Sequence, residues 1–205
     1  EMLLIRDRTG IKPLYYYWDN RLMLFSSELK SMHQHPGFKK NIDVNSLSLF
    51  LQYSYIPSPY SIFENTHKLE PGHYLKLSLK TRMFQTHKYW DVLDYYNQPK
   101  LQISEEEAMN EMEKLMRSAY EYRMVADVPV GVFLSGGYDS TSVAALLQTG
   151  RTEKIKTFTI GYAEAEYNEA HEAKKRSEYR GTDHYEWYVT AKVAADVMEQ
   201  LPEIY

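Results

Sequence analysis

Residues 130–140 read Val-Gly-Val-Phe-Leu-Ser-Gly-Gly-Tyr-Asp-Ser, and a stretch with helical spacing follows them. The apolar run over residues 130–134 predicts a buried strand, and residues 141–148 predict a helix that ends at Gly150. Two adjacent glycines, Gly136 and Gly137, let backbone N–H groups turn toward one point without obstruction by a Cβ atom. The stretch therefore predicts a strand, a glycine loop and a helix in direct succession.

This loop has the chemistry of an anion site. Its N–H groups, the hydroxyls of Ser135 and Ser140 and the positive end of the next helix all attract negative charge. Asp139 would be repelled by bare phosphate, so its presence predicts a Mg²⁺ ion that bridges carboxylate and phosphate oxygens. Neither a Walker loop nor a dinucleotide fingerprint is present. A plain strand–turn–helix corner is the alternative, but the full motif favours pyrophosphate binding.

The rest of the second half alternates strands with helices, which predicts a parallel α/β sheet. A parallel sheet places the glycine loop at the carboxyl end of a strand, where ligands of such sheets bind. Ser104 and Glu107 form a capping box before a helix over residues 105–123, whose Met109, Met112 and Met116 we expect in the core. The remaining expected elements are strands over 157–160 and 184–189, and helices over 168–179 and 191–201, the last one ended by Pro202.

The first half is predicted to be rich in strands. Asp19 and Asn20 form a turn between two apolar runs, which predicts a hairpin over residues 14–25. The other expected elements are strands over 2–5, 74–79 and 83–90, and helices over 27–32 and 43–53. Residues 91–103 form a polar connector in which the composition changes. We therefore expect two domains, residues 1–95 and 96–205.

Composition excludes several classes of protein. The 205 residues carry a net charge of −4, which argues against a nucleic-acid binder with a basic surface. No apolar stretch is long enough to span a membrane, and no signal peptide is recognisable. Cysteine is absent, which rules out disulfides and thiolate chemistry within these residues and fits the cytoplasm. The chain starts at Glu1 and stops at Tyr205 inside apparent structural patterns, so we expect a piece of a longer protein.

The glycine loop resembles the pyrophosphate loop of the ATP-pyrophosphatase superfamily. With the preceding Asp127-Val-Pro-Val-Gly-Val132, it is similar to the asparagine synthase family of glutamine-dependent synthetases. Phe158-Thr-Ile-Gly161 resembles that family's second nucleotide-contacting strand. The segment Gly181-Thr-Asp-His-Tyr-Glu186 resembles its Gly-Thr-x-His-His-Glu segment, with Tyr185 in place of the second His.

The first half resembles the N-terminal-nucleophile glutamine amidotransferase domain of the same family. The resemblance is carried by Arg6-Asp-Arg-Thr-Gly-Ile-Lys-Pro-Leu-Tyr15, by Ser26-Ser-Glu-Leu-Lys30, by residues 62–75 and by Tyr89-Trp-Asp91. The implied fold class is α/β: the C-terminal part of an amidotransferase mixed β-sandwich, then the start of a parallel, Rossmann-like ATP-pyrophosphatase domain.

The resemblance implies a ligase that makes asparagine from aspartate, glutamine and ATP through an acyl-adenylate. It implies ATP and Mg²⁺ as ligands, small-molecule substrates including glutamine-derived ammonia, and no nucleic-acid or membrane partner, and it admits a homodimer. Carried over residue by residue, Leu134 and Ile160 contact the adenosine, and Ser135, Gly136, Gly137 and Ser140 hold the pyrophosphate. Gly161 permits close approach of the nucleotide. Asp139 binds Mg²⁺ or orients the pyrophosphate.

The sequence also departs from the family's pattern. The amidotransferase nucleophile is an N-terminal Cys, so we expect no glutamine hydrolysis and no catalytic residue within these residues. Tyr138 stands where an aliphatic residue is more common. Two alternatives stay open: a family enzyme that amidates another acceptor, such as a surface-polysaccharide sugar, and a nucleotide-binding module without catalysis.

Overall fold

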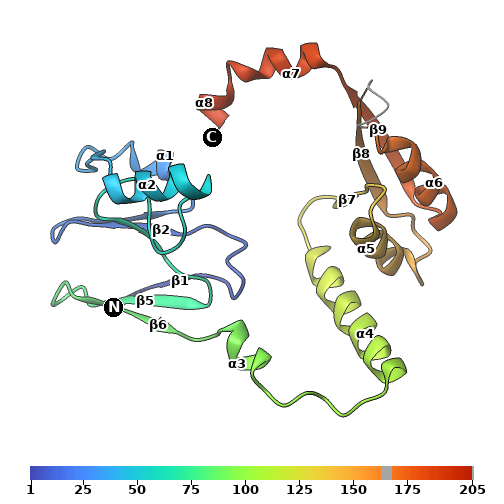
Figure 1. Ribbon diagram of the computed structural model, residues 1–205, viewed down its shortest axis with the longest axis horizontal. Helices are drawn as coiled ribbons and strands as arrows, with labels where there is room; N and C mark the ends of the chain where they lie inside the picture. Colours follow the sequence, from blue (N-terminus) through green and yellow to red (C-terminus); the bar gives the residue numbers. More distant parts are fainter. Residues whose placement is uncertain (163–167, 205) are drawn as a thin grey trace. The chain divides into compact units, whose positions relative to one another are not determined.

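The computed structural model describes residues 1–162 and 168–204. The chain divides into two compact units, Glu1–Lys100 and Leu101–Tyr205 (Figure 1). Each unit has strands paired among themselves and hydrophobic clusters of its own. The division lies five residues beyond the expected boundary between residues 95 and 96.

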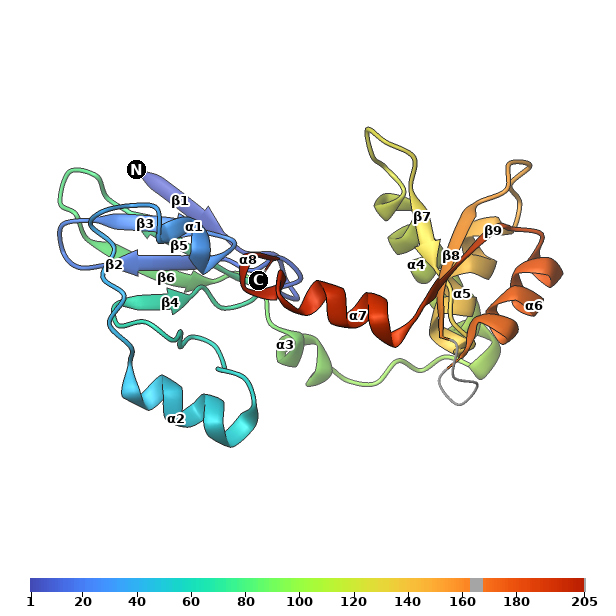
Figure 2. The ribbon, with the colours of Figure 1, turned by 90° about the horizontal axis from the view of Figure 1, so that it is seen from above.

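The first unit contains two three-stranded sheets, and both are antiparallel throughout. One has the order β1-β5-β6, and the other has the order β3-β2-β4 (Figure 2). Their strands are β1 (Met2–Ile5), β2 (Tyr15–Trp18), β3 (Met23–Ser26), β4 (Thr66–Lys68), β5 (His73–Leu77) and β6 (Phe84–Lys88). The expected hairpin of β2 and β3 is confirmed, and Asn20 adopts a positive φ of 70° in its turn.

The alternation of side chains along β2 explains how this unit is layered. Tyr16 points into the core between the two sheets, where it packs with Leu69 and Leu75. Its neighbour Tyr17 points to the opposite face and packs with Met32 and Phe38, beside the short helix α1 (Leu29–Met32). The central strand β2 therefore contributes side chains to two hydrophobic clusters, one on each of its faces.

Two further helices of this unit begin at aspartate caps, which accept a hydrogen bond from a backbone N–H group in the first turn. Asp43 caps α2 (Val44–Tyr53). Asp91 caps α3 (Val92–Tyr96), which lies inside the stretch that we expected to be a polar connector. The connector therefore begins with a short helix that the sequence analysis did not predict.

The second unit is built on a parallel sheet with the order β7-β8-β9, as predicted. Its strands are β7 (Gly131–Phe133), β8 (Lys156–Tyr162) and β9 (Asp183–Val189). Helix α5 (Tyr138–Gln148) connects the first two strands, and α6 (Ala170–Arg180) precedes β9. Gly181 ends α6 in the left-handed region, at a φ of 70°.

Helices cover one face of this sheet. Leu134, Ala144, Leu147, Ile155 and Ala173 form the core between the sheet and the helices. Along β8, Thr157 and Thr159 are buried on the helix side, whereas Phe158 and Ile160 are exposed on the opposite face. That opposite face also carries Phe133, Tyr185 and Trp187, all exposed.

Helix α4 (Glu105–Arg123) has the predicted bounds, and its capping box is present: Ser104 and Glu107 bond to each other's backbone N–H groups. The expectation that its methionines form a core stripe was wrong. Met109 is 54% exposed and Met112 is 57% exposed. The contact of the helix with the core is made near its C-terminal end, by Tyr120 and the following Met124.

The last expected helix is divided in two. Helix α7 (Ala191–Met198) ends before the expected residue 201, and a short helix, α8 (Leu201–Ile204), follows. Position 202 therefore lies inside a helical turn instead of ending the longer helix. None of the helices in the described ranges is long and apolar enough to cross a membrane.

Candidate functional site

The glycine loop lies where the sequence places it, between the end of β7 and the first turn of α5, and Gly137 is the N-cap of that helix. A cavity of about 320 Å³ opens beside it at the carboxyl ends of β7 and β8. The cavity is lined by Phe133, Leu134, Ser135, Ser140, Phe158, Thr159, Ile160 and Glu169.

The two serine hydroxyls of the loop meet each other. Ser135 Oγ and Ser140 Oγ are 2.8 Å apart, and Ser140 Oγ also accepts a hydrogen bond of 3.1 Å from the backbone N–H of Ser135. Ser135 Oγ accepts a further bond from the N–H of Gly137, at 3.2 Å. The groups expected to hold phosphate are thus gathered at one point by hydrogen bonds among themselves. A bound anion would replace some of these hydrogen bonds with its own oxygens as acceptors.

The start of the loop is fixed to the neighbouring strand through Leu134. Its N–H donates to the carbonyl of Phe158 at 2.8 Å, and its own carbonyl accepts a bond of 2.5 Å from the hydroxyl of Thr159. The sequence analysis did not single out Thr159. The period-two pattern of Phe158, Thr159 and Ile160 could have placed its hydroxyl on the helix-covered face, although not its partner.

The two glycines of the loop are needed for space, since neither has a positive φ. A Cβ atom on Gly136 would lie 3.3 Å from the Cβ of Glu172, and one on Gly137 would lie 3.3 Å from Ser135 Oγ. Glu172 is an acidic residue in the first turn of α6. A hydrogen bond from Lys175 lowers the pKa of its carboxyl. The close approach of α6 therefore sets how much room the loop has.

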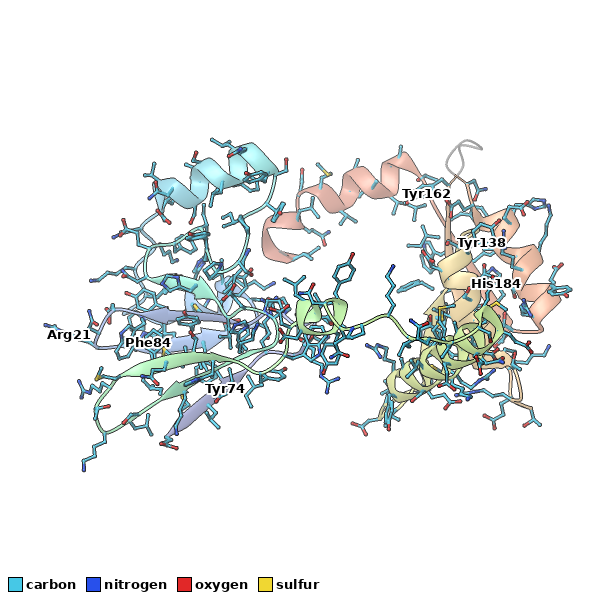
Figure 3. All side chains as sticks on the ribbon, turned by 60° about the horizontal axis from the view of Figure 1, so that its bottom comes forward. Arg21, Tyr74, Phe84, Tyr138, Tyr162 and His184 are labelled. Carbon is cyan, nitrogen blue, oxygen red and sulfur yellow. The ribbon has the colours of Figure 1, made fainter. Side chains whose placement is uncertain are left out.

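Asp139 lies in the first turn of α5 and is exposed. Within the described ranges, no group of three or more acidic, His or Cys side chains could hold a metal ion by itself. Tyr138, labelled in Figure 3, is 86% exposed, so its departure from the family's pattern does not disturb the core.

The predicted site residues divide into three groups. Leu134, Ser135, Ser140 and Ile160 line the cavity. Gly136, Gly137 and Asp139 lie in the loop and the first turn of α5 beside it. Gly161 differs, because the space for a Cβ atom there is occupied by the ring of Tyr188 at 2.7 Å and by Ala170 at 3.1 Å. The structure thus gives Gly161 a reason in packing, and all the ligand contacts stay predictions.

Four lining residues, Phe133, Phe158, Thr159 and Glu169, were not among the predicted site residues, although Phe158 and Thr159 belong to the segment that resembles the family's second nucleotide-contacting strand. Phe158 presents an aromatic surface on the open side of the sheet, and its ring stacks on Tyr185 with centroids 5.3 Å apart. Glu169, the N-cap of α6, brings a carboxylate to the edge of the cavity.

Two family models match the chain. Residues 1–90 match the glutamine amidotransferase domain, and residues 111–205 match asparagine synthase. The two matches follow the division of the chain into its two compact units. The sequence resemblance to this family is therefore confirmed.

Curated relatives agree with the family models. A protein of Methanocaldococcus jannaschii, named provisionally as glutamine-hydrolyzing asparagine synthetase 2, is 37% identical over 98% of this chain. Glutamine-hydrolyzing asparagine synthetase 3 of Bacillus subtilis is 29% identical over 95% of it. Amidase chry2 of Gibberella zeae is 36% identical over 72% of it. The chain spans 38%, 33% and 21% of the lengths of these three relatives.

Proposed function

The chain belongs to the asparagine synthase family, and from this premise we propose that its second unit binds the phosphates of ATP in an enzyme that forms asparagine. The observation that carries the proposal is the loop of Ser135 and Ser140, whose hydroxyls and N–H groups converge at the carboxyl end of a parallel strand. Convergent N–H donors at the start of a helix are a common solution for binding phosphate.

The proposed reaction activates a carboxylate that is otherwise a poor electrophile. An oxygen of the aspartate side chain attacks the α-phosphorus of ATP, the bond to the bridging oxygen breaks, and pyrophosphate leaves. Ammonia then attacks the carbonyl carbon of the acyl-adenylate, AMP leaves, and the nitrogen loses a proton to give the amide. Charge that develops on pyrophosphate is stabilised by donors already held in place.

Within this chain, the backbone N–H groups of the glycine loop and the two serine hydroxyls bind the leaving pyrophosphate. Leu134 and Ile160 supply the apolar side of the cavity against the adenosine, and the missing side chain of Gly161 leaves room for Tyr188 and Ala170 to pack on β8. Bound Mg²⁺ would neutralise phosphate charge, and Asp139 would hold it beside the loop.

For the first unit we propose the part of a glutamine amidotransferase domain that its family match describes. The 205 residues contain no cysteine, so we assign no nucleophile for glutamine hydrolysis among them. We also propose a cytoplasmic enzyme that works on small molecules, because the net charge of −4 does not favour nucleic acid.

Calorimetric titration of the 205-residue chain with ATP, with and without Mg²⁺, tests the phosphate site. We expect binding that requires Mg²⁺ and that weakens at least about tenfold in Asp139→Ala, since a charge-assisted contact is lost. Asp196→Ala removes an exposed carboxylate from α7 and should bind as the parent chain does. No binding by the folded chain, or equal binding by both variants, would contradict the proposal.

An acceptor other than aspartate is the second candidate, and the similarity to Amidase chry2 favours keeping it. The two differ in product, so the test is an amidation assay with ¹⁵N-labelled glutamine on the enzyme that contains this chain. Labelled asparagine supports the first candidate. Pyrophosphate release with aspartate absent and another carboxylate present supports the second. ATP binding without release of pyrophosphate under either condition would point to the module without catalysis.

A further inference from the structure

A second cavity, of about 540 Å³, lies in the helical layer of the second unit, where α4 packs against α5 and α5 against α6. Met109, Met112 and Met116 line it from α4, Tyr138 lines it from α5, and Arg176 and Arg180 line it from α6. No residue that lines it also lines the cavity beside the glycine loop. The two cavities are therefore separate features of this unit.

The positive charge in this cavity is not matched by a carboxylate. Neither Arg176 nor Arg180 has a salt-bridge partner among the residues that the structure describes. Glu113 lines the same cavity but is paired with Arg117 at 3.0 Å, and Glu172 is paired with Lys175 at 2.9 Å. Arg176 exerts only a weaker attraction on Glu172.

Arg176 also has an unsatisfied donor. Its Nε atom is buried and has no hydrogen-bond partner within the described part of the chain. A buried donor without an acceptor is energetically unfavourable, so the Arg176 side chain gains if it moves to meet an acceptor in the cavity. The guanidinium presents its donors in a planar fork that fits the oxygens of a carboxylate or a phosphate.

The α4 side of the cavity is mostly apolar, and its one carboxylate, Glu113, is paired with Arg117. Three methionines at helical spacing on α4 line the cavity. Two of them, Met109 and Met112, have more than half of their surface exposed. Methionine side chains are flexible and polarizable, and they fit irregular apolar ligands. The volume of the cavity also lies within the range of pockets for small molecules, about 300–1,000 Å³.

We propose that this cavity binds an organic anion, a molecule in which a carboxylate or phosphate group is joined to an apolar body. The acidic group meets Arg176 and Arg180, and the apolar body lies along Met109, Met112 and Met116. The site is independent of the proposed function, because none of its residues is assigned to ATP.

Nuclear magnetic resonance of ¹³C-methyl-labelled methionine in the 205-residue chain tests this proposal directly. Decanoate and decyl phosphate are the two anionic probes, and decanol and inorganic phosphate are the matched controls that lack one half of the ligand. We expect saturable shifts of the Met109, Met112 and Met116 methyl signals with one or both anionic probes. The methyl signals of the first unit, among them Met32, should not move. The tighter binder of the two, decanoate or decyl phosphate, shows whether the cavity prefers a carboxylate or a phosphate group.

Two variants test the role of the guanidinium groups. Arg176→Gln should weaken binding of the better probe about tenfold or more, because a charged hydrogen bond is lost. Arg180→Gln, on the exposed part of α6, should weaken it too and gives a second test if the first variant fails to fold. Arg151→Gln, an exposed arginine outside the cavity, should bind normally. Absence of methyl shifts, binding of decanol as tight as that of the anions, or unchanged affinity in both cavity variants would overturn the proposal.

Discussion

The hydroxyl of Thr159 donates a hydrogen bond of 2.5 Å to the carbonyl oxygen of Leu134, across 25 positions of sequence. Both residues are buried, and Leu134 is the last residue before the serine that opens the glycine loop. The bond gives a partner to a buried carbonyl at the point where β7 ends. Thr159 thus holds the position of a loop to which it does not itself belong.

Replacement of Thr159 by valine should therefore weaken ATP binding without removing any proposed ligand contact. Valine has nearly the same shape but leaves the Leu134 carbonyl without its donor, a loss of about 1–3 kcal/mol. We expect a rise in the dissociation constant of MgATP in calorimetry and faster hydrogen exchange of the loop amides. Thr159→Ser keeps the hydroxyl and should restore both. Thr152→Val, in an exposed loop, serves as the control, and wild-type loop exchange in Thr159→Val would contradict the positioning role.

The hydrogen bond between Thr159 and Leu134 could not be predicted from the sequence, whereas the glycine loop could. Ser135 and Ser140 were predictable, because a local motif of six residues places them on one turn between a strand and a helix. The partner of Thr159 was not predictable, because the bond depends on the register of two strands that are distant in sequence. Local patterns specify which elements form, and non-local pairing decides which side chains meet.

Helix α4 shows the same limit for burial. The 3.6-residue period and the capping box gave its bounds correctly, since both are local properties. The period also gave the stripe of Met109, Met112 and Met116, but the core contact is made farther along, at Tyr120. An amphipathic pattern identifies a face of a helix, whereas its depth of burial depends on the elements packed against it. The short helix α3 was missed because five residues give too little periodicity.

The capping box of α4 provides a second prediction. Ser104 Oγ accepts the Glu107 N–H at 3.2 Å, and the Glu107 carboxylate accepts the Ser104 N–H at 2.8 Å. Ser104→Ala should destabilise the start of the helix by about 1 kcal/mol. Hydrogen exchange of the first-turn amides should accelerate accordingly. Ser118→Ala, at an exposed position inside the same helix, should not accelerate it, since alanine favours helix interiors.

Gly72 provides a third prediction, in the first unit. Its φ is 67°, and a Cβ atom there would lie 2.2 Å from the carbonyl oxygen of Trp90. That contact is with backbone, which cannot rotate away as a side chain can. The Gly72 carbonyl also accepts the N–H groups of Tyr89 and Trp90, so a shift would disturb the end of β6.

Gly72→Ala should therefore lower the free energy of unfolding well beyond the cost of the backbone conformation alone. The matched control is Gly150→Ala, with a φ of 79° and open space around its Cβ position. That control carries only the cost of the left-handed conformation, about 1–2 kcal/mol. Thermal unfolding of the two variants should show the larger loss for Gly72→Ala. Equal losses would mean that Trp90 moves away freely.

A buried chain of hydroxyls in the second unit ends at His184 and gives the fourth prediction. Thr182 donates to Ser177 at 2.9 Å, Thr157 lies 3.1 Å from Thr182, and Thr157 lies 2.9 Å from His184 Nδ1. His184 Nε2 is buried and has no partner among the described residues. Burial lowers the pKa of this imidazole below its ordinary value of 6.5, against the opposing effect of Glu186.

A lowered pKa means that the unfolded chain binds the proton more tightly than the folded chain does. The second unit should therefore lose stability as the pH falls through about 6.5 toward the folded pKa of His184, and gain none from this group above it. His184→Gln should reduce this pH dependence of unfolding, whereas His171→Gln, at an exposed position on α6, should leave it unchanged. The direct measurement is a titration of the His184 ring by nuclear magnetic resonance. A midpoint at or above 6.5 would show that the imidazole takes up its proton inside the fold, which requires an acceptor for Nε2 there.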